Sequence, residues 1–128
     1  MPDAPRLLLV DDDPVILRLL QVNFRLEGYE IETAPEGAVA LASAADRPPD
    51  AVVLDMMLPD LSGFEICRRL RALPGLAGIP VVFLTGRTEG PDPAQESLGP
   101  GSVDLLAKPF DPAEVVATVR RRLTERAT

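Results

Sequence analysis

The sequence predicts an α/β domain in which five parallel strands form one sheet with helices on both faces. Short apolar runs alternate with helical patterns along the chain, which is typical of strand–helix units joined by right-handed crossovers. The runs at 6–10 (RLLLV) and 50–55 (DAVVLD) are almost continuously apolar, as in strands buried on both faces of a parallel sheet. Capping residues follow several of these runs closely, so we expect helices to begin soon after the strands end.

The first half of the chain is predicted to hold two strand–helix units and a third strand. Asp13 is the expected N-cap of the first helix, because Pro14 suits the first helical position and Gly28 suits the residue after the last turn. The next strand alternates apolar and polar residues, as at the edge of a sheet, and an alanine-rich helix follows it. The expected elements are a strand at 6–10, a helix at 14–27, a strand at 29–34, a helix at 36–45 and a strand at 50–55.

The second half continues the alternation but contains one irregular segment. Ser62 and Glu65 have the spacing of a capping box, and Asp111 begins a similar signature before the last helix. The segment 86–102 is rich in glycine and proline, so its helix, the fourth, is expected to be short or irregular, and a plain surface loop is the alternative. The expected elements are a helix from 62 to near 74, a strand at 79–85, a short helix at 93–98, a strand at 103–107 and a helix at 111–125.

Length and composition limit the number of domains and the kinds of partner. The chain has 128 residues, and we assign 1–128 to a single domain. The net charge of −7 argues against nucleic acid or an anionic membrane as a partner of this domain. No apolar run approaches the ~20 residues of a membrane span, and no signal peptide is recognisable. The single cysteine, Cys67, is consistent with a reducing compartment, so we expect a cytoplasmic protein.

Oxygen-bearing side chains and one lysine follow the ends of four predicted strands. Asp11 and Asp12 follow the first strand, Asp55 ends the third, Thr85 ends the fourth, and Lys108 follows the fifth. In a parallel sheet these positions share the edge at which ligands bind. Crowded carboxylates favour a hard cation such as Mg²⁺, and a hydroxyl with an ammonium suits phosphoryl oxygens. The set predicts an aspartyl-phosphate site, although a solvated acidic loop is an alternative interpretation of the aspartates taken alone.

Lysine occurs once in the chain, at Lys108, whereas the other twelve basic residues are arginine. A compact ammonium and a planar guanidinium are not interchangeable, so this position is predicted to require an ammonium. Histidine is absent, which excludes histidine ligands, histidine general bases and a phosphohistidine donor within the chain.

Four motifs resemble those of the receiver domain of two-component response regulators, the CheY-like family. They are VDDDP at 10–14, LDMMLPDLSG at 54–63, FLTG at 83–86 and AKPF at 107–110, and the resemblance extends from Leu7 to Leu123. It implies a flavodoxin-like, doubly wound (βα)5 fold with strand order 2-1-3-4-5. It also implies a phosphorylation-controlled signalling switch that catalyses only its own phosphorylation and dephosphorylation.

The resemblance assigns a role to each residue of the metal site. Asp55 is the expected phosphoacceptor, and Mg²⁺ is the expected cofactor. Asp12 is the expected direct ligand, Asp11 acts mostly through a metal-bound water, and the backbone carbonyl of Met57 is a further ligand.

The resemblance also names the groups that bind the phosphoryl group, and the partners. Thr85 and Lys108 are expected to contact its oxygens, and the bond between Lys108 and Pro109 is expected to be cis. The donor would be a sensor histidine kinase or a phosphotransfer protein, and the output a downstream protein or an effector domain.

Three alternatives remain open at this point. Leu105 stands where the family usually carries tyrosine or phenylalanine, which keeps a pseudo-receiver, an interaction module without phospho-switching, as the second interpretation. A second alternative is an aspartate-nucleophile hydrolase. That class typically carries a second acid two residues after the nucleophile, and Met57 at this position argues against it. The chain is either a stand-alone regulator or the receiver part of a longer protein.

Two expectations concern surfaces and switching. Val15, Val22 and Leu26 form an apolar stripe on the first helix, which either is exposed and docks the kinase or packs under the last helix. Activation is expected to order the segment 86–102 around the phosphoryl group, because Leu105 cannot reproduce the movement of an aromatic ring.

Overall fold

The chain forms one five-stranded parallel sheet with the order β2-β1-β3-β4-β5. The computed structural model describes residues 4–86 and 103–127. This topology confirms the predicted fold class. The strands are β1 (Arg6–Val10), β2 (Glu30–Ala34), β3 (Ala51–Asp55), β4 (Val81–Thr85) and β5 (Val103–Ala107).

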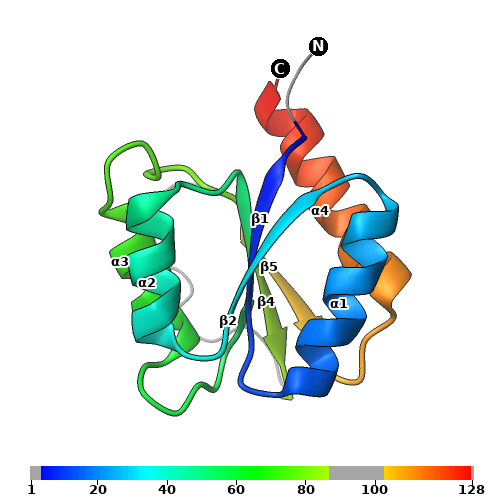
Figure 1. The fold of residues 1–128 in the computed structure, drawn as a ribbon, viewed down its shortest axis with the longest axis horizontal. Helices are drawn as coiled ribbons and strands as arrows, with labels where there is room; N and C mark the ends of the chain where they lie inside the picture. The colour runs from blue at the N-terminus through cyan, green and yellow to red at the C-terminus, as the bar shows by residue number, and fades with distance from the viewer. Residues whose placement is uncertain (1–3, 87–102, 128) are drawn as a thin grey trace.

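Helices cover both faces of the sheet, as Figure 1 shows: α2 and α3 lie on one side and α1 and α4 on the other. The label α4 belongs to the last helix of the chain. The short helix predicted at 93–98, and the expected ordering of 86–102, lie outside the described residues except for Gly86. The helices are α1 (Pro14–Leu26), α2 (Gly37–Asp46), α3 (Gly63–Arg71) and α4 (Pro112–Ala127).

The core has two halves, one on each face of the sheet. Along β1, Leu7 and Leu9 pack with α1 and α4, whereas Leu8 and Val10 pack with α2 and α3. All four side chains are buried, as are the strand residues 51–55 and 81–85. The continuous apolar runs of the sequence therefore reflect strands that face a helical layer on both sides.

The edge strand β2 is more polar, as its alternating pattern predicts. Glu30 and Glu32 are exposed, and both form ion pairs with Arg6 of the neighbouring strand, at 2.8 and 3.4 Å. The strand begins after Tyr29, whose ring packs edge-to-face on Phe24 at a centroid distance of 5.5 Å. Tyr29 thus joins the core next to α1 and does not extend the strand.

The predicted helix caps are present. Asp13 accepts the N–H of Val15 at 2.8 Å, Ser62 accepts the N–H of Glu65 at 3.2 Å, and Asp111 accepts the N–H of Ala113 at 2.9 Å. Gly28 follows α1 with a φ of 91°, a left-handed conformation that favours glycine. These local signals place the strand-to-helix loops, and hence the candidate site, at the carboxyl edge of the sheet.

The apolar stripe on α1 is exposed. The exposed fractions of Val15, Val22 and Leu26 are 73%, 44% and 81%, and Leu19, at 42%, lies between them. Packing of the stripe under the last helix, the alternative drawn from the sequence, is therefore wrong. Among the described helices, none is long and apolar enough to cross a membrane.

Candidate functional site

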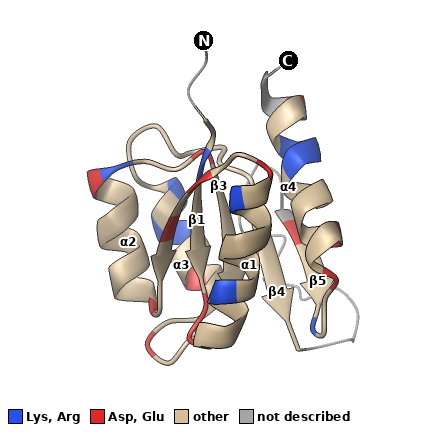
Figure 2. Ribbon diagram, turned by 45° about the vertical axis from the view of Figure 1, so that its right-hand side comes forward, with Lys and Arg blue, Asp and Glu red and all other residues tan. Residues whose placement is uncertain are grey.

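Three carboxylates meet where β1 and β3 end. Asp11 follows β1, Asp55 ends β3, and one carboxylate oxygen from each of Asp11, Asp12 and Asp55 lies within 4.8 Å of the others. Asp11 and Asp55 are buried, with exposed fractions of 1% and 5%, whereas Asp12 is exposed. The cluster is thus buried at its base and open to solvent beside Asp12. Figure 2 shows acidic residues in red along the loops beyond the carboxyl ends of the strands.

The only lysine of the chain reaches into this cluster from the end of β5. The Nζ atom of Lys108 lies 3.1 Å from Oδ2 of Asp11 and 3.4 Å from Oδ2 of Asp55. Its backbone N–H donates to the carbonyl of Thr85 at 2.7 Å, and the following bond to Pro109 is cis, as predicted. One ammonium therefore stands between two buried carboxylates that are 44 positions apart in sequence.

The charges of the pocket are not balanced by Lys108 alone. Burial raises the pKa of Asp11, and the charge of Asp55 adds to this effect. The N–H of Asp13 and the ammonium of Lys108 oppose the rise in the pKa of Asp11 without cancelling it. Burial disfavours the charged form of Lys108, but its hydrogen bond to Asp11 and the two nearby carboxylates leave its pKa raised. Additional positive charge in the pocket is therefore favourable.

The loop after β3 holds the backbone of Met57 beside Asp55. The N–H of Met57 donates to Oδ1 of Asp55 at 3.0 Å, and Met57 forms an antiparallel bridge with Ser62. The N–H of Gly63 donates to the carbonyl of Met56 at 2.9 Å. A Cβ atom on Gly63 would lie 2.8 Å from the Met56 Cα atom, so this close approach requires glycine. The residues directly after Asp55 therefore form a tight loop that is closed by the Met57–Ser62 bridge and the bond from Gly63 to Met56.

Thr85 lies on the strand next to Asp55. It ends β4, it is buried with an exposed fraction of 8%, and its carbonyl binds Lys108. In the sheet register Asp55 is opposite Leu84, whose carbonyl accepts the N–H of Met56 at 3.0 Å. Adjacent strands therefore carry all the predicted side chains to one edge.

The donor set fits a hard divalent cation. The clustered side chains offer carboxylate oxygens only, which Mg²⁺ prefers, and the described residues contain no histidine or thiolate cluster at this edge. Asp11, Asp12 and Asp55 are the side chains that could hold it. The acidic pocket therefore has the donor chemistry of a Mg²⁺-binding site.

Two features of the site region were not predicted from the sequence. Asp60 binds the first N–H groups of α2, although it belongs to the loop after β3. The sequence did indicate that an outside acceptor was needed, because no Ser, Thr, Asn or Asp directly precedes this helix. Its first N–H groups must therefore bind an acceptor from another part of the chain or water. The exposure of Leu19 was also missed, because helical spacing alone does not show how much of α1 the last helix covers.

The fold and the acidic pocket are those of a phospho-accepting signalling domain. The family model of the response regulator receiver domain matches residues 7–120, which is most of the chain. The chain therefore belongs to the response regulator receiver domain family, as the sequence motifs predicted.

The curated relatives of this chain include transcriptional regulators. The chain is 41% identical over 119 residues to the DNA-binding dual master transcriptional regulator RpaA of Synechocystis, covering 93% of this chain and 49% of the relative. It is 43% identical over 113 residues to the transcriptional regulatory protein KdpE of Mycobacterium tuberculosis, covering 88% of this chain and 48% of the relative. The chain thus spans about half the length of these proteins.

Solved receiver structures share the fold over nearly the whole chain. The chemotaxis protein CheY4 of Vibrio cholerae has a TM-score of 0.83 at 29% identity, covering 93% of this chain and 98% of that one. The receiver domain of sensor histidine kinase PA1611 from Pseudomonas aeruginosa has a TM-score of 0.81 at 31% identity, covering 94% and 98%. In the latter structure a magnesium ion is coordinated in the active-site cleft.

Proposed function

We propose that this domain accepts a phosphoryl group on Asp55 from a histidine kinase or a phosphotransfer protein, and that this event controls a downstream protein or effector domain. The observation that carries the proposal is the cluster of Asp11, Asp12 and Asp55 within 4.8 Å, with the Lys108 ammonium 3.4 Å from Asp55. It combines a buried carboxylate nucleophile, cation ligands and a phosphate-binding donor in one pocket.

Asp55 is prepared for the transfer by its neighbours. Its Oδ1 atom accepts the N–H of Met57, which holds the carboxylate plane, and its Oδ2 atom faces Lys108. In the transfer a carboxylate oxygen forms a bond to phosphorus as the bond from phosphorus to the donor breaks, and the donor leaves with that electron pair. Lys108 and Thr85 then bind oxygens of the transferred group.

Mg²⁺ would be held by the carboxylates of Asp11, Asp12 and Asp55 and the backbone carbonyl of Met57. When bound, it supplies positive charge that offsets the charge of the phosphoryl oxygens. The chain's own contribution is to keep Asp55 buried and oriented, and to place the Lys108 ammonium where the phosphoryl group will lie. This accounts for a lysine at 108 in a chain whose other basic residues are all arginine.

Intact-mass measurement after incubation with acetyl phosphate tests the assignment. One phosphoryl group should be added to the wild type with Mg²⁺ and none with EDTA. Asp55→Asn should abolish the addition, and Asp46→Asn, at an exposed acid on α2, should leave it unchanged. Incorporation by Asp55→Asn at the wild-type rate would refute the assignment. No incorporation by the wild type would favour the pseudo-receiver alternative.

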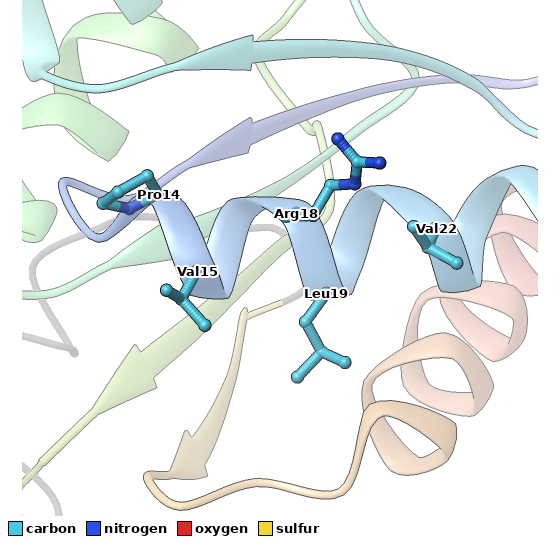
Figure 3. A pocket seen from close by; sticks show the side chains of 5 residues that line it. All are labelled: Pro14, Val15, Arg18, Leu19 and Val22. Carbon is cyan, nitrogen blue, oxygen red and sulfur yellow. The ribbon is translucent and has the colours of Figure 1, made fainter.

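The exposed apolar surface of α1 is our proposed contact for the phosphodonor. It comprises the stripe of Val15, Val22 and Leu26 together with Leu19. Figure 3 shows Val15 and Leu19 projecting together from one side of the helix, and Arg18 from the other. Together with Pro14 and Val22 they line an open, largely apolar hollow. A contiguous apolar surface on a soluble domain is typical of a protein–protein contact, and an amphipathic helix of the kinase would suit it.

Two phosphodonors separate the docking role of this surface from the chemistry at Asp55. Transfer from a histidine kinase requires docking, whereas labelling by acetyl phosphate does not. With a histidine kinase that phosphorylates the wild type, Val22→Lys should slow transfer, whereas labelling by acetyl phosphate should be unchanged. Val39→Lys is the control, because Val39 is exposed to a similar extent on α2 (41% against 44%). Equal transfer rates for Val22→Lys and Val39→Lys would contradict the assignment of this surface.

A further inference from the structure

The N-terminus of α2 is capped by a side chain from a different loop. Glu36 occupies the N-cap position, but its side chain makes no capping hydrogen bond. Asp60 instead accepts the N–H of Gly37 through Oδ1 and the N–H of Ala38 through Oδ2, both at 2.9 Å. Its Oδ1 also accepts the N–H of Leu61 at 3.0 Å. The bonds from Gly37 and Ala38 lower the pKa of Asp60, which favours the ionised form that suits a helix N-terminus.

The same aspartate lies in the middle of the loop that orients the phosphoacceptor. The loop 56–62 starts directly after Asp55 and closes through the bridge between Met57 and Ser62. Its first turn carries the N–H that binds the Asp55 carboxylate at 3.0 Å. The bridge closes the base of this loop, so Asp60 lies near its tip, whereas the Met57 N–H at its base binds the reacting side chain. We call residues 56–62 the hoop.

Close packing supports this link between the hoop and α2. A Cβ atom on Gly37 would lie 2.8 Å from Cδ1 of Ile66 on α3 and 3.1 Å from Cδ1 of Leu61 in the hoop. Leu58 and Leu61 both pack against the core on this face. The start of α2 therefore rests directly on the hoop, and a shift of one displaces the other.

We propose that Asp60 is a positioning residue for the phosphorylation site. By tying the hoop 56–62 to α2, it sets the place of the Met57 backbone, and through it the orientation of the Asp55 carboxylate and of the carbonyl offered to Mg²⁺. Asp60 itself touches neither the cation nor the phosphoryl group. The inference rests on the proposed function, because Asp55 and the Met57 carbonyl are the groups that Asp60 positions. The contacts that link α2 to the hoop do not depend on that function.

Mg²⁺ affinity, measured by calorimetric titration with Mg²⁺ alone, tests the positioning role. Asp60→Ala should weaken Mg²⁺ binding by roughly tenfold, the low end for outer-shell supports of metal ligands. Asp60→Asn should fall between the wild type and Asp60→Ala, because its amide oxygen still accepts from Gly37 while its NH₂ group faces the N–H of Ala38. Ala42→Gly is the matched control, since it destabilises the same helix at an exposed position. It should bind Mg²⁺ like the wild type.

Hydrogen exchange gives a second readout that does not depend on metal. The N–H groups of Met57 and Gly63 should exchange faster in Asp60→Ala than in Ala42→Gly. Wild-type Mg²⁺ affinity in Asp60→Ala, or an equal loss in Ala42→Gly, would overturn the proposal, and Asp60→Asn carries the test if Asp60→Ala does not fold. If the wild type itself bound no Mg²⁺, the proposed function would fail instead. Even then, the link between α2 and the hoop would be overturned if the N–H groups of Met57 and Gly63 exchanged no faster in Asp60→Ala than in Ala42→Gly.

Discussion

Replacing Lys108 with methionine removes the ammonium from the acidic pocket while keeping an unbranched side chain of similar length. In the metal-free protein the buried carboxylate of Asp11 then loses its partner at 3.1 Å, and Asp55 loses one at 3.4 Å. Two buried carboxylates with oxygens within 4.8 Å of each other are left without a compensating charge. We therefore expect a loss of stability that depends on whether a cation is present.

The size of this loss follows from the geometry. A unit charge pair at the distance between Lys108 and Asp11 is worth about 5 kcal/mol at an effective dielectric constant of about 20. The Lys108 side chain is 24% exposed and Asp11 keeps its bond from the N–H of Asp13, so most of that energy is screened or replaced. We expect a net loss of about 2 kcal/mol, below the usual 3–5 kcal/mol for a fully buried broken pair. For a chain of this length this corresponds to a fall in Tm of about 7 °C.

Thermal unfolding in EDTA and in saturating Mg²⁺ checks the expectation. Mg²⁺ should raise the Tm of Lys108→Met more than that of the wild type, because the cation replaces the missing charge. Lys108→Arg separates charge from shape: it should keep more of the metal-free stability but accept phosphate poorly, because a guanidinium fork does not fit a site built around one ammonium. A Tm for Lys108→Met equal to that of the wild type in EDTA would refute the reasoning.

Three further outcomes are expected. Asp12→Ala should weaken Mg²⁺ binding more than Asp11→Ala, because Asp12 is the expected direct ligand, and a titration showing the reverse order would contradict this. Gly63→Ala should cost about 1–3 kcal/mol in urea denaturation, since its Cβ would lie 2.8 Å from the Met56 Cα atom, whereas Gly78→Ala, with no atom within 4 Å, should be nearly neutral. In EDTA the stability should fall as pH rises from 3.8 through the raised pKa of Asp11, because over that range the folded state retains a proton that the unfolded state has released. Asp11→Asn should remove this fall, which denaturation curves at several pH values would show.

Local patterns in the sequence predicted most of the architecture. The apolar runs of β1, β3 and β4, the alternation along β2 and the caps at Asp13 and Ser62 depend on neighbouring residues, so periodicity and capping preferences identify them. The candidate site residues followed from the same reasoning, because polar residues at the carboxyl ends of parallel strands share one edge. Their motifs and the strand order came from resemblance to receiver domains, which the family match and the sheet topology confirm.

The tertiary structure decided the contacts between distant segments. Lys108 binds Asp11 across 97 positions, and Asp60 caps a helix 22 to 23 positions earlier in the chain. The exposure of Val15 and Leu26 depends on which part of α1 the last helix leaves uncovered. Periodicity describes which face of an element is apolar, whereas these contacts depend on how packed elements are placed relative to one another. A buried charge or an orphan N–H group must find a partner, but only the assembled fold determines which one it finds.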